Sequence, residues 1–474
     1  MTAFEFLDNR MVSAPIGRHT KRFHRQINAV KKWISTGCRG SIEWPTGVGK
    51  TRIATEAIAV LRRDVWNRSV IVVVPTLQLK DQWEKGLALL GMLENSQVFV
   101  INGLVKKRLS CELLILDEVH RYAAKTFFKV FEAVTFDFVL GLTATMKRLD
   151  KKHVILQEKA PIIDKMSIFE AKKEGYMASY TRYNLAVEMS PEEREIYRDL
   201  AGKYNFNMDK FHRDFELMMQ CSMGIDPKII RQTYMAPQVV RYAERLGWKG
   251  NTPYKAYQIW MHNKAKARGV HKDEIWGGDT AHPNHPQKLY IWAINGMKAI
   301  REIKQFIHNH PGKKAAAISL LRELDKKAIV FGETIESAEI IHTSLPDTTV
   351  LYHSKMTKKE REASLNAVFT GTKKVILTAR ALDQGTDWPE AEMGVEVDRN
   401  SSTIQATQRL GRVARLHTFA DGEEKRAMYV CIYIPDTKDY DWMNKGQTGG
   451  FPAKWVTSIE QILQMERELV NTLN

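Results

Sequence analysis

The sequence has few of the features that mark secreted, zinc-binding or membrane proteins. Its four cysteines are far apart and form no CxxC pair, which argues against both a disulfide framework and a zinc site: Cys38, Cys111, Cys221 and Cys431. No apolar run approaches the roughly 18 residues that a membrane span needs, and charged residues interrupt the N-terminal apolar stretch. We therefore expect a cytoplasmic protein with no membrane partner.

Length and charge give the first positive indications. The 474 residues exceed the roughly 250 to 300 at which one hydrophobic core stops growing, so we expect two or three domains. The net charge of +16 and the pI near 9.4 favour a polyanionic partner, because basic surface binds phosphate backbones by releasing counterions. Residues 231–320 hold 15 basic and 5 acidic residues, so most of the surplus lies there.

Short apolar runs alternate with amphipathic stretches in two parts of the chain. In the first part, residues 69–75 and 111–117 are typical of strands buried on both faces, with a helix at 77–90 between them. The late part repeats the pattern, with strands at 327–331, 349–352, 374–379 and 428–434 and helices at 357–369 and 403–414. This alternation predicts an α/β fold with two doubly wound parallel sheets.

The middle of the chain breaks this rhythm. It begins as a helix in which Ser190 and Glu193 form a capping box, and it then becomes rich in Trp, His and Lys. We predict four regions: a first lobe at 1–165, a linker and mainly helical basic insert at 166–311, a second lobe at 312–440, and a C-terminal tail at 441–474. The amphipathic helix in that tail is expected to pack on the second lobe.

A glycine-containing loop lies between a strand at 41–44 and a helix that runs to residue 61. Its glycines allow backbone N–H groups to surround phosphate oxygens, and the nucleotide-binding residues predicted here are Thr46, Gly47, Val48, Gly49, Lys50 and Thr51. The Lys50 ammonium would neutralise the β- and γ-phosphates of ATP, and the Thr51 hydroxyl would bind Mg²⁺. Trp44 stands where the general pattern has its first glycine.

Two adjacent acids follow the buried strand at 111–117. Asp117 at the strand end is suited to bind Mg²⁺, and Glu118 is suited to polarise the attacking water. A solvated acidic turn is the alternative for such a pair. The loop at 45–51 upstream and the buried strand before the pair favour the catalytic interpretation.

The segment QATQRLGRVAR, residues 405–415, is the third element of the predicted ATP site. Arg412 and Arg415 are three residues apart and share one helical face, so their guanidinium groups are suited to meet a γ-phosphate held by the other lobe. Arginines in that role stabilise the charge that develops during phosphoryl transfer.

In this order, the motifs resemble those of superfamily 2 helicases of the DExH kind, closest to the XPB, RecG and UvsW-like group that includes phage branch-migration helicases. The resemblance covers residues 22–415. It implies two RecA-like lobes with the basic insert between them, ATP and Mg²⁺ as cofactors, and the host cytoplasm as location if the source is viral. In this family Gln408, Arg412 and Arg415 would face ATP.

The resemblance also assigns roles to residues outside these three elements. Gln26 would read the adenine, although Phe23 occupies the place where the family usually has an arginine. Pro75 and Thr76 would touch the nucleic-acid backbone. Residues that would couple hydrolysis to strand movement are His120, Thr143, Ala144 and Thr145, and residues at the lobe interface are Gly385 and Asp387.

The insert carries interleaved aromatic and basic residues. Such a composition is typical of surfaces that follow a phosphate backbone and stack on unpaired bases, and the residues predicted to do so are Trp260, Trp276, Lys264, Lys266 and Arg268. The alternative is that the tryptophans form a small core of the insert and the lysines its solvated face. His271, His282 and His285 are expected to be loop histidines, because no Cys or acid lies at ligand spacing.

Together these features predict an ATP-dependent DNA helicase or translocase, acting as a monomer on forked, branched or partly single-stranded DNA in replication, recombination or repair. A duplex translocase and an RNA helicase remain open alternatives. A binding scaffold with an inactive ATPase is disfavoured, because the expected catalytic residues are all present.

Overall fold

The structure is a computed structural model. It describes residues 2–12, 18–63, 65, 67–123, 128–146, 153–222, 237–249, 282–379, 388–400, 402–445 and 452–471. The chain divides into two compact units. One comprises residues 1–187 and 311–474 and contains two lobes, and the other comprises residues 188–310.

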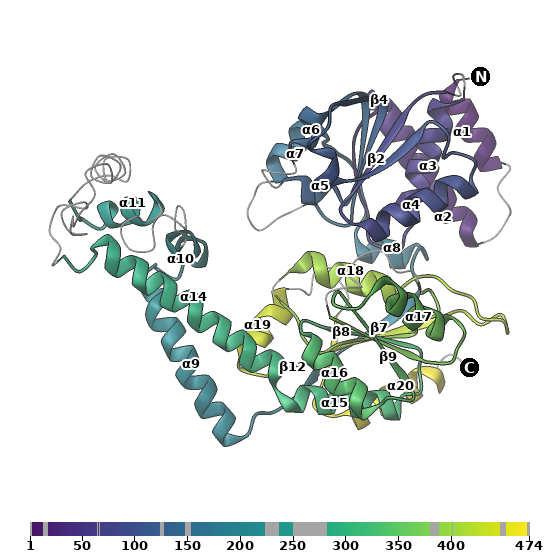
Figure 1. The fold of residues 1–474 in the computed structure, drawn as a ribbon. Coiled ribbons are helices and arrows are strands. Elements are labelled where there is room, and N and C mark those ends of the chain that lie inside the picture. Colours follow the sequence, from purple (N-terminus) through teal and green to yellow (C-terminus); the bar gives the residue numbers. More distant parts are fainter. Residues whose placement is uncertain are drawn as a thin grey trace. The chain divides into compact units, whose positions relative to one another are not determined.

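The first lobe is built on a six-stranded sheet in the order β3-β2-β4-β5-β1-β6, with every neighbouring pair parallel. The strands are β1 (Arg39–Glu43), β2 (Val70–Val74), β3 (Ser96–Val100), β4 (Leu109–Asp117), β5 (Val134–Thr143) and β6 (Ile162–Lys165). Each crossover between parallel strands needs a connecting segment, and helices supply most of them (Figure 1).

Alternate residues of β2 show why both faces of this sheet are covered. Val70, Val72 and Val74 join a core with α2 (Arg18–Ser35), α3 (Lys50–Leu61) and α4 (Leu77–Leu89). Ile71 and Val73 point to the other face, against α5 (Ile101–Leu104), α6 (Val130–Ala133), α7 (His153–Lys159) and the 3₁₀ turn η1 (Val119–Ala123). Successive side chains of a strand point to opposite faces, so a continuous apolar run fits a doubly wound sheet.

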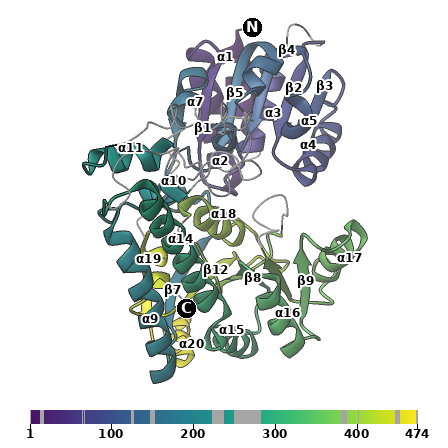
Figure 2. The same cartoon turned by 60° about the vertical axis from the view of Figure 1, so that its left-hand side comes forward.

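The second lobe has seven parallel strands in the order β13-β7-β12-β11-β8-β10-β9. They are β7 (Ser179–Ala186), β8 (Ala328–Gly332), β9 (Thr349–His353), β10 (Val375–Ala379), β11 (Met393–Glu396), β12 (Arg426–Tyr433) and β13 (Lys454–Val456). One face packs against α15 (Pro311–Glu323), α16 (Ile335–Ser344) and α20 (Ile459–Asn471), and the other against α17 (Lys358–Phe369) and α18 (Thr403–Val413) (Figure 2).

These two sheets confirm the predicted fold class, and α20 packs on the second lobe as expected. The lobe boundaries differ from the predicted ones in two places. Strand β7 lies in the range 166–311 that we grouped with the linker and insert, and β13 lies in the predicted tail. Both pair at one edge of the second sheet, an arrangement that depends on distant residues and leaves little local signal.

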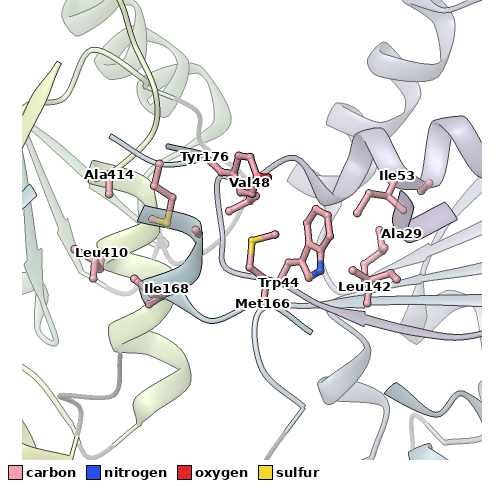
Figure 3. Close-up of a cluster of buried hydrophobic side chains, with 14 of the residues drawn as sticks. Ala29, Trp44, Val48, Ile53, Leu142, Met166, Ile168, Tyr176, Leu410 and Ala414 are labelled. Carbon is pink, nitrogen blue, oxygen red and sulfur yellow. The ribbon is translucent and has the colours of Figure 1, made fainter. Parts of the chain in front are cut away.

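A core cluster connects the two lobes. Val48 in the loop after β1 and Met166 after β6 lie in one buried cluster with Tyr176, and with Leu410 and Ala414 at the end of α18 (Figure 3). Because these side chains come from the predicted phosphate-binding loop, the connection between the lobes and the arginine helix, the lobes share apolar contacts beside the predicted ATP site.

The second unit is helical. Its described helices are α9 (Pro191–Asp209), α10 (Phe215–Ser222), α11 (Pro237–Arg245) and α14 (Pro286–Asn309). The predicted capping box is present at the start of α9. Helices α9 and α14 run antiparallel, since Tyr197 near the start of α9 contacts Phe306 near the end of α14, at 5.9 Å between ring centroids. A Cβ on Gly296 would lie only 2.4 Å from Met218 Sδ, so α14 and α10 approach closely there.

Candidate nucleotide site

The loop after β1 has the backbone conformation that its glycines predict. Gly47 and Gly49 have φ angles of 90° and 89°, in the left-handed region that side chains with a Cβ rarely adopt. Gly49 is also the N-cap of α3, so the loop ends at a helix N-terminus, which favours anions. The Thr46 hydroxyl oxygen is buried and has no hydrogen-bond partner among the described residues. This loop therefore fits a bound phosphate chain.

Lys50 and Gln26 both contact the backbone of this loop. The Lys50 ammonium donates to the carbonyl oxygens of Trp44 and Pro45, at 3.0 and 3.2 Å. Burial lowers the pKa of Lys50, while Glu118 and Asp117 oppose that shift. The Gln26 amide donates to the carbonyl oxygens of Val48 and Gly49, at 2.9 and 3.3 Å. Gln26, which the resemblance gives as the adenine-reading residue, thus lies beside the predicted phosphate-binding loop.

Trp44, the departure from the general loop pattern, is fully buried at the end of β1. Its indole N–H donates to Asp164 Oδ2 on β6 at 3.0 Å, and the Arg25 guanidinium lies 4.6 Å from the centre of its ring. Arg25 and Lys32 also form ion pairs with Asp164. This network joins helix α2, the start of the loop and the edge strand. The signal for it was present in the sequence as an unusual tryptophan, but its acidic partner is 120 residues away.

The two predicted acids lie at the carboxyl end of β4. Both oxygens of Asp117 accept hydrogen bonds, Oδ2 from the Trp83 indole N–H at 2.8 Å and Oδ1 from the Glu118 backbone N–H at 3.0 Å. Burial, with a further contribution from Glu118, raises the pKa of Asp117 to about 6. A nearby cation such as Mg²⁺ would favour the charged form. Glu118 has a φ of 53°, so the chain turns sharply directly after the strand.

Three of the residues predicted to couple hydrolysis to movement, His120, Thr143 and Thr145, are joined by hydrogen bonds close to Glu118. His120 Nδ1 lies 2.9 Å from the Thr143 hydroxyl, which in turn donates to the Thr145 carbonyl oxygen at 2.8 Å. The same ring nitrogen lies 3.4 Å from Glu118 Oε2. Ala144 is buried between the two threonines. The sequence motifs around residues 118 and 143 are therefore in direct contact.

Helix α18 carries Arg409 and Arg412 but ends at Val413, so Arg415 lies just beyond it. The prediction that Arg412 and Arg415 share one helical face is therefore wrong, because the helix ends before Arg415. The backbone of α18 touches the loop after β1. A Cβ on Gly411 would lie 2.7 Å from the Thr46 carbonyl oxygen, and one on Gly47 would lie 3.1 Å from Arg415 Cγ. Burial lowers the pKa of Arg415 to about 10, and Arg412 and Arg415 are both close enough to lower the pKa of Lys50. The structure thus brings the lysine of one lobe and two arginines of the other into one site.

Two further residues of α18 have different surroundings. Gln408 is buried, and its amide nitrogen has no hydrogen-bond partner among the described residues, as expected of a group that awaits a ligand. Arg409, in contrast, is 1% exposed and bound by two carboxylates, with its guanidinium 2.8 Å from Glu333 and 2.9 Å from Glu396. The sequence pattern did not indicate this ion cluster, because its acids come from β11 and from the segment after β8.

Several predicted residues lie outside the described part of the chain. These are Gly385 and Asp387 at the predicted lobe interface, the insert residues Trp260, Trp276, Lys264, Lys266 and Arg268, and the loop histidine His271. Pro75 and Thr76 are described, and the Thr76 side chain caps α4 by accepting a hydrogen bond from the Leu79 N–H. No helix in the described ranges is long and apolar enough to cross a membrane.

The comparison with protein families agrees with these motifs. Residues 312–417 match the helicase conserved C-terminal domain, and residues 20–110 and 102–148 match the type III restriction enzyme res subunit. In S. cerevisiae, Dbp5 bound to RNA and ADP BeF3 has a similar fold, with a TM-score of 0.53, 12% identity, and coverage of 98% of this chain and 99% of that one.

Two curated proteins are similar in sequence. The DNA 3'-5' translocase XPB2 of Sulfurisphaera tokodaii is 25% identical over 442 residues, which span 88% of this chain and 82% of that protein. The XPB helicase/translocase subunit of general transcription and DNA repair factor IIH from Danio rerio is 26% identical over 273 residues, spanning 48% of this chain and 33% of that protein.

The matched helicase domains and the XPB-like relatives support a nucleic-acid-dependent ATPase of the superfamily 2 helicase class, built on two RecA-like lobes. Within that superfamily the chain is XPB-like. ATP is the nucleotide that this class of enzyme uses, normally with Mg²⁺.

Proposed function

We propose that the chain is an ATP-dependent DNA helicase or translocase that unwinds or branch-migrates forked and junction DNA in replication, recombination or repair. The observation that carries this proposal is the meeting of Lys50, Asp117 and Arg412 in one site, in a chain that aligns over 88% of its length with a protein named a DNA translocase. The motif Asp117-Glu118-Val119-His120 supports the DExH subtype. Phage origin and cytoplasmic location stay predictions.

Each residue of the site has a proposed task. Bound ATP would supply the phosphoryl group, and Mg²⁺ would neutralise its charge. Lys50 would bind the terminal phosphates, and Thr51 and Asp117 would hold the metal. Glu118 orients the attacking water and accepts its proton. Residues that contact the nucleotide from the second lobe are Gln408, Arg412 and Arg415, and the residues around its phosphates are Thr46, Gly47, Val48 and Gly49.

The lobe contacts in the structure suggest how hydrolysis is coupled to movement. Arg412 and Arg415 belong to the second lobe and Lys50 to the first. Loss of the γ-phosphate therefore removes the electrostatic attraction that a shared phosphate provides between the lobes. His120 links Glu118 to Thr143, and Thr145 accepts a hydrogen bond from Thr143. We propose that this series of contacts transmits the loss of the γ-phosphate, sensed at Glu118, to the segment after β5. Gly385 and Asp387 are proposed to take part at the lobe interface.

The helical unit offers one described surface suited to nucleic acid, the aromatic-basic face formed by Phe206, Lys210 and Trp292. Phe206 is 59% exposed, and the Lys210 ammonium lies 4.9 Å from the centre of its ring and 5.2 Å from that of Trp292. An exposed ring beside an ammonium group can stack on an unpaired base while the charge pairs with phosphate. Trp248, in contrast, is 2% exposed and packs against His285, as a core residue does.

A duplex translocase that does not separate strands is the second candidate, favoured by the similarity to the DNA 3'-5' translocase XPB2 of Sulfurisphaera tokodaii. An unwinding assay with forked DNA, a four-way DNA junction and an RNA duplex distinguishes these functions when ATP hydrolysis is followed in the same tubes. We expect hydrolysis and strand separation with fork and junction, and neither with RNA. Hydrolysis on duplex DNA without strand separation would favour the translocase, and activity confined to RNA would refute the proposal.

A further inference from the structure

Trp83 on helix α4 makes a contact that the motifs do not assign. Its side chain is 3% exposed, and its indole N–H donates to Oδ2 of Asp117 at 2.8 Å. The other carboxylate oxygen of Asp117 accepts from the Glu118 backbone N–H. One donor on each oxygen fixes the plane of the carboxylate, and a carboxylate that binds a metal is commonly oriented by such outer hydrogen bonds.

A second tryptophan in the same lobe shows what a structural indole does. Trp33 on α2 is also fully buried, and its N–H donates to the main-chain carbonyl oxygen of Val139 on β5 at 2.9 Å. A buried indole N–H needs an acceptor, and a carbonyl oxygen satisfies it. Trp44 donates to a buried acid, Asp164, within a network that joins α2 to the edge strand. Trp83 donates to the acid proposed to bind the metal, so its hydrogen bond serves the orientation of that acid as well as the packing of α4.

The surroundings of Trp83 also place it at the site. It lines a pocket of about 290 Å³ between α3 and α4, whose wall includes Thr51 and Asp117, the two residues proposed to hold Mg²⁺. Its helix begins directly after Thr76, the proposed backbone contact, and seven residues of helix span about 10 Å. Gln78 in the first turn of α4 donates to the Tyr352 hydroxyl of the second lobe at 3.1 Å.

We propose that Trp83 is a positioning residue of the metal site: its indole N–H holds the Asp117 carboxylate in the orientation that binds Mg²⁺ and ties that carboxylate to α4. This inference rests on the proposed function, because it requires Asp117 to bind the metal of Mg-ATP. Trp83 touches neither substrate nor metal, so its effect should appear in metal binding and leave the phosphate-binding loop unchanged.

The test compares Trp83→Phe with Trp33→Phe, since each substitution removes one buried indole N–H from the same lobe. Mn²⁺ serves as a paramagnetic probe, and its binding in the presence of a non-hydrolysable ATP analogue is followed by electron paramagnetic resonance. We expect Trp83→Phe to weaken Mn²⁺ binding about 10- to 100-fold. The Mg²⁺ concentration for half-maximal ATP hydrolysis should rise in parallel. Trp33→Phe should leave both at the wild-type value.

Trp83→His keeps a ring N–H on a smaller ring and separates the hydrogen bond from the packing. A smaller loss of Mn²⁺ affinity than in Trp83→Phe supports the proposal, whereas equal losses assign the effect to packing. Wild-type Mn²⁺ affinity in Trp83→Phe would overturn the inference and leave the proposed function standing. If the wild-type chain showed no nucleic-acid-stimulated ATP hydrolysis, the proposed function itself would fail.

Discussion

The two arginines of helix α18 have different tasks: Arg409 stabilises the second lobe, and Arg412 serves the ATP site together with Arg415, which follows the helix. Arg409 donates to Glu333 and Glu396, and also to the Asp398 carbonyl oxygen at 3.0 Å. The side chains of Arg409, Glu333 and Glu396 are almost fully buried. Arg412 lies near Lys50. Arg409→Ala is therefore expected to destabilise the lobe, and Arg412→Ala to slow hydrolysis without that loss.

The magnitude follows from the burial of the cluster. Removing one partner of a buried ion pair costs about 3 to 5 kcal/mol, because the remaining charge is left without compensation. Arg409→Ala removes this guanidinium from both carboxylates, while Glu396 keeps the Arg399 guanidinium at 3.5 Å, so we expect a loss within this range. At about 2 to 4 °C per kcal/mol for a domain of 150 to 250 residues, the melting temperature of the lobe should fall by about 6 to 20 °C.

Differential scanning calorimetry measures this loss, with Arg412→Ala as the matched control from the same helix. The control should melt within about 3 °C of the wild type. Its ATP turnover should nevertheless fall by on the order of a thousandfold, as expected of an arginine that stabilises transition-state charge. Wild-type melting of Arg409→Ala, together with a turnover loss equal to that of Arg412→Ala, would refute the division of roles.

Two further predictions concern the acid beside Arg409 and the aromatic-basic face. Burial tends to raise the pKa of Glu396, but Arg399 and Arg409 outweigh it and hold that pKa below its ordinary value. Its contribution to stability is therefore present above the unfolded pKa of about 4.3 and lost as the pH falls through the lower folded pKa. Glu396→Gln should have a lower melting temperature than the wild type at pH 7, and the difference between the two melting temperatures should narrow below about pH 4. A difference that does not change with pH would contradict a stabilising charge on Glu396. Phe206→Ala should weaken single-stranded DNA binding by about 1 to 3 kcal/mol in a fluorescence anisotropy titration. Phe369→Ala removes another exposed ring and should leave the affinity unchanged. Equal DNA affinities of the two variants would exclude stacking at Phe206.

Local patterns predicted the parts of the fold that buried strands and glycine loops define. Strands β2 and β4 were found because their apolar runs are continuous, and the phosphate-binding loop was found because Gly47 and Gly49 allow left-handed backbone there. Strands β7 and β13 were missed. Both contain polar or charged residues and gain their place by pairing with distant strands, which a local pattern does not record.

Within the site, the sequence predicted which residues carry charge but not what each charge contacts. Arg409 and Arg412 belong to one motif and are three residues apart, so helical periodicity alone gives them neighbouring positions on one face. Arg409 nevertheless meets acids of β11 and of the segment after β8, whereas Arg412 lies near Lys50. The bond from Trp83 to Asp117 joins residues 34 apart. Such contacts depend on how strands are ordered in the sheet, which the spacing of motifs does not give.

The most direct test of the account is the rate of ATP hydrolysis with and without forked DNA, measured for the wild type, Lys50→Ala and Glu118→Gln, with DNA affinity measured on the same preparations. We predict that the fork stimulates hydrolysis in the wild type, that both variants lose the stimulated rate, and that both keep their DNA affinity, because each substitution removes a phosphate or water contact and leaves the DNA contacts in place. Stimulated turnover within a few-fold of the wild type in either variant would contradict the assignment of the ATP site to these residues.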